Sequence, residues 1–460
     1  MGRVYSSRKI LDYFFNFSND WSCNIKIKIM QTIDFIKKKI LIYGMGLSGH
    51  SCLNFLKKKN DVKIFDDNFS LKYKKNKKYF LSKNNIIKLK FDFIILSPGI
   101  DFQRCNLKKY IIKNWSRVIT EFDIFYLTYP NNKKITITGT NGKSTTCQML
   151  YNIFKLKKLD VRLVGNIGKP PLQEKKIKKN TIFIVEASSY QISYSKYFKS
   201  DYAVILNLNA DHLERHKSLT KYAKAKIKLI CNQEKNKLSL IERDSVIINR
   251  LILNKNIKSK IIKVNYNKAN FFKKNINNDY LLDKNNLNNI HFVYKISKIF
   301  GIPTNKIFKS LNSFKGLKFR KQIVYNKFNL KIINDSKSTT FSSTNGLLST
   351  YQNIYWIVGG LFKKRDKFIL EKKYYKNVCA YIIGNNKNYF VNQFKNKINF
   401  KYLKNLKKAV IAIKNDIKKD KNKKIVLFSP AAASFDQFKN FEHRGECFNS
   451  ILKKINLHGK

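Results

Sequence analysis

Hydrophobic and polar positions follow a repeating pattern from residue 39 onward. Short apolar runs end in glycine or polar residues, as in KILIYGMGLSG from Lys39 and FDFIILSPGI from Phe91, and helix-like segments such as HSCLNFLKKK lie between them. Strands that alternate with helices in this way favour a parallel sheet with crossover helices. We therefore predict a first α/β unit over residues 39–122.

The same alternation continues in two further units. KITITGTNGKSTTCQML, TIFIVEASS and YAVILNLNADH each begin as a buried strand, and a third unit after Gly316 contains the strands IYWIVGG and AYIIG. Residues 232–289 are rich in lysine and asparagine, and we expect only loops and weak strands there before a helical region. The predicted fold class is α/β with three units in series. In open parallel sheets, ligands bind where the strands end, so polar residues at those ends are the first candidates for a site.

The formal net charge of +64 raises the question of a nucleic-acid partner. Only 11 of the 93 basic residues are arginine, and the lysines are spread over the whole length of the chain. A nucleic-acid surface would be local and would use arginine for bidentate contacts. The lysine excess therefore indicates a uniform drift in amino-acid composition and not a binding surface, and we expect no nucleic-acid partner.

The remaining composition predicts a soluble, cytoplasmic protein. No apolar run approaches the roughly 20 residues that span a bilayer, so we expect no membrane insertion. The seven cysteines form no C-x-x-C pair, which suits a reducing compartment. Residues 1–38 are basic and aromatic but lack the apolar core of a secretory signal. We interpret them as an extension that precedes the fold.

The stretch from Lys134 to Leu150 combines a strand, a glycine turn and the start of a helix. Such a junction directs free backbone N–H groups and the helix dipole at one spot, which favours an anion. Lys143 adds a positive charge, and Ser144 or Thr145 can bind Mg²⁺. The usual P-loop has a glycine where this chain has Ile137, and an ordinary turn with a solvated lysine is the alternative. We predict that ATP binds through Gly139, Thr140, Asn141, Gly142, Lys143, Ser144 and Thr145.

A bound triphosphate needs a divalent metal ion, which carboxylates or imidazoles near the turn could bind. Glu186 in VEASS and His212 in NADHLERH both follow strands of the second unit. Each has a plain alternative, a helix cap for Glu186 and a surface position for His212. Their shared placement at strand ends favours a role as metal ligands.

A second glycine turn lies in the first unit, where Gly44-Met45-Gly46-Leu47-Ser48-Gly49 joins a strand to a helix. Asp66 ends the next strand. Glycine for a tight turn and an acid for a ribose are typical of dinucleotide binding, although the signal is weak by itself. It would indicate a dehydrogenase and would leave the ATP site unexplained.

Six motifs resolve this conflict. TGTNGKST, VGNIGKPPL, EASSYQI, LNADHLERH, NDSKST and SPAAASFDQFKNFEHRG follow one another in an order and spacing that resemble the Mur ligases. The resemblance runs from about Lys39 to the C-terminus. The last motif, together with GMGLSG, is most similar to the members of the family that use D-glutamate.

The resemblance implies three domains. Residues 39–122 would form a Rossmann-like domain that holds the UDP of the substrate, with Gly46, Leu47 and Ser48 in the turn and Asp66 at the uracil. Residues 123–316 would form a central P-loop ATPase domain with a mostly parallel sheet. Residues 317–460 would form a C-terminal Rossmann-like domain that carries the amino-acid site.

The resemblance also implies a two-step reaction. The carboxylate of UDP-N-acetylmuramoyl-L-alanine attacks the γ-phosphate of ATP, and the amine of D-glutamate then attacks the resulting acyl phosphate. Lys143 and Mg²⁺ on Ser144 or Thr145 and on Glu186 would neutralise the phosphate charge. His212 would bind a second Mg²⁺. Lys226 matches the lysine that the family carbamylates, a modification that makes it a carboxylate-like metal ligand.

Further positions match residues that contact substrates in the family. Asn166 and Ser188 match contacts of the muramoyl substrate, and Asn289, Arg320 and Asp335 match contacts of ATP. The remaining matches concern the reacting end and the D-glutamate site, and they are Lys337, Thr339, Lys363, Ser434 and Phe441. Ser434 could also cap a helix in AASFDQF. Asn68, Asn285 and Phe319 depart from the family pattern.

Three alternatives stay open from the sequence. Another Mur-type or folylpolyglutamate-type ligase would share the central motif and add a different amino acid. A nucleotide-binding protein without turnover would not need Glu186, His212 and Lys337 to act together. A nucleic-acid-binding protein would need a contiguous basic face. We expect the ligase, and we expect it to be a monomer.

Overall fold

The computed structural model describes residues 35–68, 76–209, 211, 213–253, 255–278, 280–282, 284–363, 366–418 and 422–455, without the side chains of residues 284 and 285. The chain divides into two compact units, Met1–Phe314 and Lys315–Lys460. Residues 1–34 of the predicted extension lie outside the described part, so its role stays open. The predicted boundary after residue 122 lies inside the first unit, and the exact boundaries of the three predicted domains stay a prediction.

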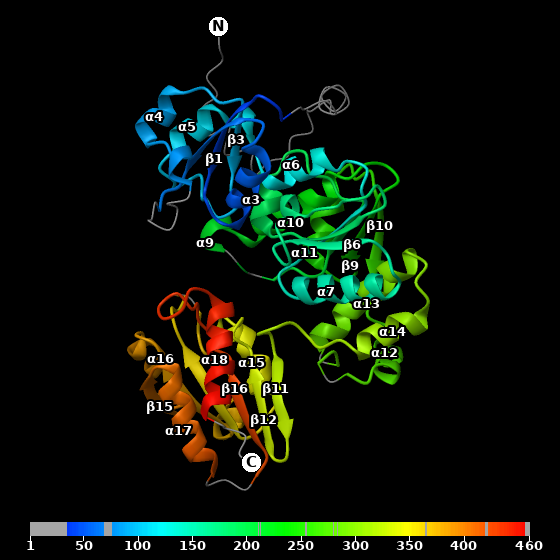
Figure 1. Cartoon of the computed structure of the whole chain (residues 1–460). Coiled ribbons are helices and arrows are strands. Elements are labelled where there is room, and N and C mark those ends of the chain that lie inside the picture. Colours follow the sequence, from blue (N-terminus) through cyan, green and yellow to red (C-terminus); the bar gives the residue numbers. More distant parts are fainter. Residues whose placement is uncertain are drawn as a thin grey trace. The chain divides into compact units, whose positions relative to one another are not determined.

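The first unit begins with a four-stranded parallel sheet in the order β2-β1-β3-β4. Its strands β1 and β3 are labelled in Figure 1. The middle of β1 is fully buried because helices and loops cover both of its faces. The chain leaves β1 toward β2 on one side and returns to β3 on the other, which is the arrangement that opens a ligand crevice. The elements are β1 Lys39–Tyr43, α3 Leu47–Leu56, β2 Asp61–Phe65, α4 Lys83–Lys88, β3 Phe93–Leu96, α5 Lys108–Lys113, the 3-10 helix η2 Trp115–Arg117 and β4 Val118–Ile119.

A six-stranded parallel sheet follows in the same unit, in the order β10-β9-β8-β5-β7-β6. Its strand β5, which leads to the predicted ATP turn, lies between β8 and β7. The strands are β5 Lys134–Thr138, β6 Val161–Gly165, β7 Ile182–Glu186, β8 Tyr202–Ile205, β9 Leu238–Glu242 and β10 Lys260–Val264. The helices are α6 Glu121–Thr128, α7 Lys143–Leu156, η3 Pro171–Gln173, α8 Ser189–Tyr194, α9 Leu213–His216, α10 Leu219–Cys231, α11 Val246–Leu253, α12 Ala269–Asn275, α13 Lys284–Ile299 and α14 Thr304–Asn312.

The expectation of loops and weak strands over residues 232–289 is wrong in part. Two paired parallel strands, β9 and β10, extend the sheet there, and the helices α11 and α12 accompany them. Lysine and asparagine hide this pattern because only a few apolar residues per element, such as Leu240 and Phe272, reach the core. Tertiary burial of those few side chains overrides the weak local preference.

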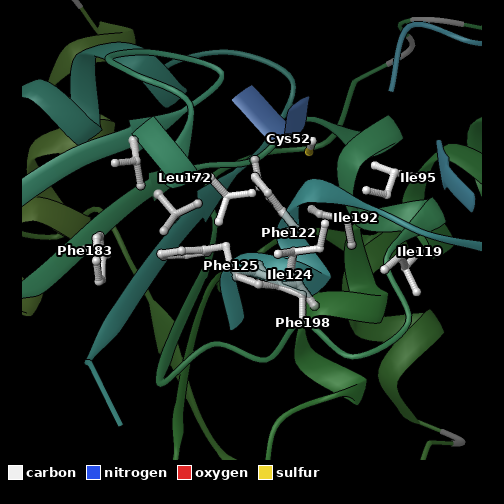
Figure 2. Packing of buried hydrophobic residues seen from close by; sticks show 14 of the residues in the cluster. Cys52, Ile95, Ile119, Phe122, Ile124, Phe125, Leu172, Phe183, Ile192 and Phe198 are labelled. Carbon is white, nitrogen blue, oxygen red and sulfur yellow. The ribbon is translucent and has the colours of Figure 1, made fainter. Parts of the chain in front are cut away.

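The alternation of side chains along the strands supplies two apolar faces to this sheet. Ile182 and Ile184 of β7 pack with α7, α13 and α14, whereas Phe183 and Val185 pack with α6, α8 and α10. The cluster around Phe183 and Val185 also contains Cys52 of α3 and Ile95 of β3, so it joins the first sheet to the second (Figure 2). The two sheets of the first unit therefore share one apolar core.

The second unit contains a six-stranded sheet in the order β11-β12-β16-β13-β14-β15. Only the edge strand β11 is antiparallel to its neighbour, and the other strands are parallel, so the predicted α/β class is confirmed with a mixed sheet. The strands are β11 Gln322–Lys327, β12 Leu330–Asn334, β13 Ile354–Gly359, β14 Val378–Ile383, β15 Asn399–Lys404 and β16 Lys424–Phe428. The helices are α15 Phe341–Leu348, η4 Lys372–Asn377, α16 Lys387–Phe394, α17 Leu406–Lys418 and α18 Phe441–Ile455.

Two further findings concern membrane crossing and the cysteines. Within the described ranges, no helix combines the length and apolar character that a membrane crossing requires. The six cysteines that the structure describes are free thiols.

Candidate active site

The turn between β5 and α7 has the backbone geometry of an anion site. Gly139 and Gly142 have φ angles of 153° and 83°, which L side chains rarely adopt, and Gly142 directly precedes the first helical residue, Lys143. A Cβ atom at Gly142 would lie 2.3 Å from Oδ1 of Asn289 on α13. Asn289, which the family resemblance placed at ATP, therefore lies against the turn. The first amides of α7 are available to a ligand because a helix leaves them without intrahelical partners.

An asparagine that the sequence analysis missed fixes the conformation of this turn. The backbone N–H of Asn141 donates to Oδ1 of Asn207 at 2.8 Å, and Nδ2 of Asn207 donates to the carbonyl of Asn141 at 3.1 Å. The N–H of Thr140 donates to the carbonyl of Asn207 at 3.0 Å. The only signal in the sequence was a polar residue just after β8. These bonds hold the turn before any ligand arrives, which lowers the entropic cost of binding.

Two lysines converge on the carbonyl of Gly139. Nζ of Lys143 donates to it at 2.9 Å and to the carbonyl of Thr140 at 2.7 Å. Nζ of Lys226 donates to the same Gly139 carbonyl at 2.9 Å and to Oγ1 of Thr138 at 3.1 Å. The structure thus brings Lys226, which the sequence could select only by resemblance, to the base of the predicted ATP turn.

The environment of Lys226 favours its neutral amine. Its side chain is 1% exposed, and burial lowers the pKa of the amine well below its usual value. The positive charge of Lys143 lowers this pKa further, while Asp211 and Glu186 act in the opposite direction. A neutral amine is a nucleophile and an ammonium is not, so this lysine is suited to covalent modification by an electrophile such as CO₂.

Glu186 ends β7 next to the turn, where it pairs in register with Ile137 of β5. Its side chain is 1% exposed, and Oε1 accepts a hydrogen bond from Nδ2 of Asn166 at 2.8 Å. Oε2 is buried, and no donor in the described part of the chain reaches it. A buried carboxylate oxygen in that state costs free energy unless a cation compensates it, so the residue fits a divalent metal ion.

The other predicted metal ligands are Ser144, Thr145 and His212. Ser144 and Thr145 lie in the first turn of α7, on the element that leaves the glycine turn. His212 lies outside the described residues, so its role stays a prediction. Among the side chains that the structure does describe, no three His, Cys, Asp or Glu residues form a metal cluster.

The first glycine turn has a different environment. Gly44 has a φ of 95°, Gly46 precedes the first residue of α3, and Leu47 is 79% exposed. Asp66 does not present free oxygens, because Oδ2 accepts the N–H of Met45 at 2.6 Å and Oδ1 accepts the N–H of Asn68 at 2.9 Å. The carboxylate of Asp66 therefore holds the turn in place, and its predicted contact with uracil stays a prediction.

A small cavity of about 10 Å³ lies where the two sheets of the first unit meet. Ser48 and Gln191 contribute to its lining, as does Glu121, the first residue of α6. Glu121 is 4% exposed, and burial raises the pKa of its carboxyl to about 7. Ser188, predicted to contact the substrate, caps α8 by accepting the N–H of Gln191 at 3.2 Å.

The helix α9 contacts both α8 and the loop after β3 through its side chains. Nε2 of His216 lies 2.9 Å from Oγ of Ser189, and its ring stacks on Tyr190 with the centroids 5.2 Å apart. Arg215 donates to the carbonyl of Ile100 and to the hydroxyl of Tyr194. The motif that contains the predicted ligand His212 is thus anchored to α8 and to the loop after β3.

The second unit gathers several predicted residues around the end of β12. Asp335 is 4% exposed, its Oδ1 accepts the N–H of Lys321 at 2.9 Å, and its Oδ2 accepts the hydroxyl of Ser429 at 2.8 Å. Burial raises the pKa of Asp335 to about 6, against the effect of these two donors. Nζ of Lys337 lies 3.6 Å from the ring centroid of Phe441.

The remaining predicted residues of this unit lie on loops. Arg320 precedes β11, Thr339 follows Lys337, and Lys363 is exposed after β13. Ser434 is 3% exposed. The alternative that Ser434 caps a helix in AASFDQF is wrong, because residues 435–440 form a turn and bends and α18 begins only at Phe441. The roles of these residues stay predictions.

Comparison with known proteins identifies the family. The sequence model of the MurD-like N-terminal domain of Mur ligases matches residues 38–119, and that of the Mur ligase middle domain matches residues 137–302. A UDP-N-acetylmuramoylalanine–D-glutamate ligase of Rickettsia prowazekii is 33% identical over 91% of this chain and 98% of its own length. The chain belongs to the Mur ligase family. A protein of the same name from Buchnera aphidicola is 34% identical over 92% of this chain and 99% of its own length.

Solved structures of the family share the fold. A MurC ligase from Thermotoga maritima has a TM-score of 0.54 at 15% identity, over 91% of this chain and 100% of that one. The MurF ligase from Thermotoga maritima, solved with ADP, has a TM-score of 0.54 at 14% identity, over 93% of this chain and 99% of that one. At these identities the likeness concerns the fold alone. The expected membership of the Mur ligase family and the three-unit α/β architecture are thus confirmed.

Proposed function

We propose that this chain is an ATP-dependent, ADP-forming ligase that adds D-glutamate to UDP-N-acetylmuramoyl-L-alanine in the synthesis of peptidoglycan precursors. The observation that carries the proposal is the group around one turn: Lys143 and Lys226 on the Gly139 carbonyl, beside the buried carboxylate of Glu186. Family relatives with this named activity align over nine-tenths of the chain, which supports the choice of substrates.

In the first step, the residues of the turn bind and align ATP. The amides at the start of α7 hydrogen-bond the phosphates, and Lys143 moves from the carbonyls of its own loop to the outer phosphates. The carboxylate of the muramoyl-L-alanine then attacks the γ-phosphorus, and the bond to the β–γ bridging oxygen breaks to release ADP. Because this transfer needs charge neutralisation and alignment, the nearby cations contribute more than any covalent group of the protein.

Mg²⁺ fits this site on the evidence of Glu186, whose Oε2 is buried and reached by no donor within the described ranges. Glu186 and Ser144 or Thr145 would hold one ion, and His212 with carbamylated Lys226 would hold a second. Bound Mg²⁺ would supply neutralisation of phosphate charge. Asn166 keeps the Glu186 carboxylate in place through its hydrogen bond to Oε1.

In the second step, the amine of D-glutamate attacks the acyl carbonyl and phosphate leaves. Lys337, Thr339, Lys363, Ser434 and Phe441 of the second unit are proposed to hold the reacting end and D-glutamate. A lysine ammonium and a serine hydroxyl are suited to the two carboxylates of this amino acid. Arg320, Asp335 and Asn289 are proposed to contact ATP.

Gly46, Leu47, Ser48 and Asp66 are proposed to form the site for the UDP part of the substrate. Asn166 and Ser188 are proposed to contact its muramoyl part. ATP and this nucleotide sugar are cytoplasmic metabolites, so we propose a cytoplasmic enzyme. We further propose that it is monomeric and that it neither inserts into membranes nor binds nucleic acid.

The test is an ADP-release assay on the purified full-length chain. UDP-N-acetylmuramoyl-L-alanine, ATP and Mg²⁺ are supplied with a panel of D-glutamate, L-alanine, L-lysine and meso-diaminopimelate. We expect turnover with D-glutamate. Turnover with another amino acid only would assign the chain to a sister ligase, and ATP binding without ADP release would favour a nucleotide-binding protein without catalysis.

A further inference from the structure

Arg444, in the first turns of α18, is the most deeply buried arginine of the second unit that the structure describes. It is 1% exposed, and its neighbour Gly445 is also buried. The guanidinium keeps its charge at neutral pH, because burial lowers its pKa only to about 10 and the charges of Asp436 and Asp335 oppose this shift. A buried cation is costly, and an apolar side chain of similar length would fill the same space at lower cost. The contacts of this arginine should therefore matter for more than packing.

Those contacts converge on a single residue, Ser336. Nε of Arg444 donates to Oγ of Ser336 at 3.1 Å, and Nη2 donates to the carbonyl oxygen of Ser336 at 2.7 Å. Nη1 is buried and has no hydrogen-bond acceptor in the part of the chain that the structure describes. Ser336 lies between Asp335 and Lys337, the two residues proposed to act at the nucleotide and reacting end. The guanidinium thus binds the backbone between two proposed functional side chains.

The same helix holds this loop at other points. The Ser336 hydroxyl donates to the carbonyl of Phe441 at 2.9 Å, and Nδ2 of Asn334 donates to the carbonyl of Gly445 at 3.0 Å. Gly445 allows the close approach, because a Cβ atom there would lie 2.3 Å from the ring of Phe319. The N–H of Lys337 in turn donates to the carbonyl of Phe319 at 2.9 Å. Side chain, backbone and ring contacts together fix both ends of the Asp335-Ser336-Lys337 segment.

We propose that Arg444 is a positioning residue that holds the segment 335–337, through Ser336, so that Asp335 and Lys337 keep the geometry that the reaction needs. This inference rests on the proposed function for the role of those two side chains. It assigns no contact between Arg444 and a substrate. The rigid fork of the guanidinium suits the task, since it fixes a hydroxyl and a carbonyl of the same residue at once.

The test compares Arg444→Met with Leu452→Ala on the same helix. Both remove buried contacts of α18, but Leu452 packs in the core near the other end of the helix and does not touch the segment. We expect Arg444→Met to lower kcat by about a hundredfold, because a displacement of about 1 Å at a reacting group has an effect of that size. Leu452→Ala should lower the melting temperature and leave kcat within a factor of about three.

Hydrogen exchange of the amides 335–339 without substrates gives a readout that does not depend on catalysis. We expect faster exchange there in Arg444→Met and unchanged exchange in Leu452→Ala. Equal losses of kcat in the two variants, or unchanged protection of these amides in Arg444→Met, would overturn the proposal. If the wild-type chain released no ADP with any amino acid, the proposed function would fail, and the exchange experiment would still decide the role of Arg444.

Two further variants keep the test decisive if Arg444→Met does not fold. Ser336→Ala removes the Nε contact and leaves the arginine in place, and it should change kcat and exchange in the same direction by a smaller factor. Arg444→Lys retains the charge and can supply one of the two donors, so it should recover part of kcat. A merely structural arginine predicts instead that kcat follows the melting temperature across all four variants.

Discussion

The two glycine turns of the first unit, residues 44–49 and 139–142, follow the same kind of buried parallel strand and begin the same kind of helix. They differ in the side chains that surround them. At the first turn, α3 starts with the exposed Leu47, and both oxygens of Asp66 accept backbone N–H groups. At the second, α7 starts with Lys143, Lys226 lies beneath the turn, and Oε2 of Glu186 meets no donor among the described residues.

This difference distinguishes a turn that is suited only to binding a phosphate group from one that is also suited to phosphoryl transfer. Backbone amides at a helix N-terminus are enough to hold a phosphate group, and both turns provide them. Transfer of a phosphoryl group also needs cations that neutralise charge as it moves. Among the described residues, only the second turn combines two lysines with a buried carboxylate oxygen at its side that could bind a metal ion. Under the proposed function, the first turn would bind the nucleotide sugar without reacting with it, which would account for a dinucleotide-like pattern without hydride transfer.

The largest effect should come from removing the cation of the second turn. We expect Lys143→Ala to lower kcat by about 10⁴-fold, as for other cations that stabilise a transferring phosphoryl group. The melting temperature should change little, because the hydrogen bonds from its ammonium to the carbonyls of Gly139 and Thr140 lie within its own loop. Steady-state ADP release measures the effect. Lys157→Ala, an exposed lysine after the same helix, is the control, and equal losses in both variants would contradict the role of the turn.

The carboxylate of the second turn should rank next. Glu186→Gln keeps the hydrogen bond from Asn166 but removes the charge, so we expect kcat to fall by about 10³-fold and the required Mg²⁺ concentration to rise. Titration of activity and of bound nucleotide with Mg²⁺ measures both changes. Folding should be preserved, because a buried charge is replaced by a neutral amide of the same shape. An unchanged Mg²⁺ dependence would remove Glu186 from the metal site.

Glu121, near the first turn, should affect the pH dependence of the free energy of unfolding and not the reaction itself. Its folded pKa of about 7 lies above the ordinary value of 4.5, so the unfolded chain loses this proton first as the pH rises. Stability should therefore fall by roughly 2–3 kcal/mol between pH 4 and pH 8 through this group. Urea unfolding of wild type and Glu121→Gln measures it: the variant should match wild type at pH 4 and exceed it at pH 8. Parallel pH profiles would refute the assignment.

The smallest effect distinguishes the backbones of the two turns. Gly142→Ala should lower the free energy of unfolding by about 2 kcal/mol and weaken ATP binding, because of its left-handed φ and the contact with Asn289. Gly46→Ala should cost less than about 1 kcal/mol, since φ is −73° and no described atom lies within 4 Å of the added Cβ. Chemical denaturation and calorimetric ATP titration compare the pair. Equal costs would show that the second turn is not the more constrained one.

Much of the fold could be predicted because it follows from local patterns of apolar residues and glycines. The strands that lead to Gly44 and Gly139 are continuous β-branched or aliphatic runs, and glycine follows them where the backbone leaves the usual conformations. The strands β9 and β10 were expected only as weak strands, because they are short and lie in a region rich in lysine and asparagine. The edge strand β11 escaped prediction, since none of its residues is buried and they carry no apolar period.

Site residues could be predicted from the sequence where their residue type is rare in the chain. They could not be selected where the type is common. Glu186 could be identified because it ends a buried strand in a chain with few acids. No spacing could select Lys226 among so many lysines. Asn207 and Arg444 were missed, because their importance lies in hydrogen bonds to residues more than 60 positions away in the chain.

By itself, the sequence determined the order of most strands and helices, the two glycine turns and the family motifs, because these depend on side-chain period and on the backbone freedom of a few residues. Only the tertiary structure decided which charged groups are buried and what they contact. It placed Lys226 under the predicted ATP turn, brought Asp66 to the amides of Met45 and Asn68, and brought Arg444 to Ser336. The reason is physical: protonation, hydrogen bonding and desolvation depend on neighbours in space, and folding alone brings those neighbours together.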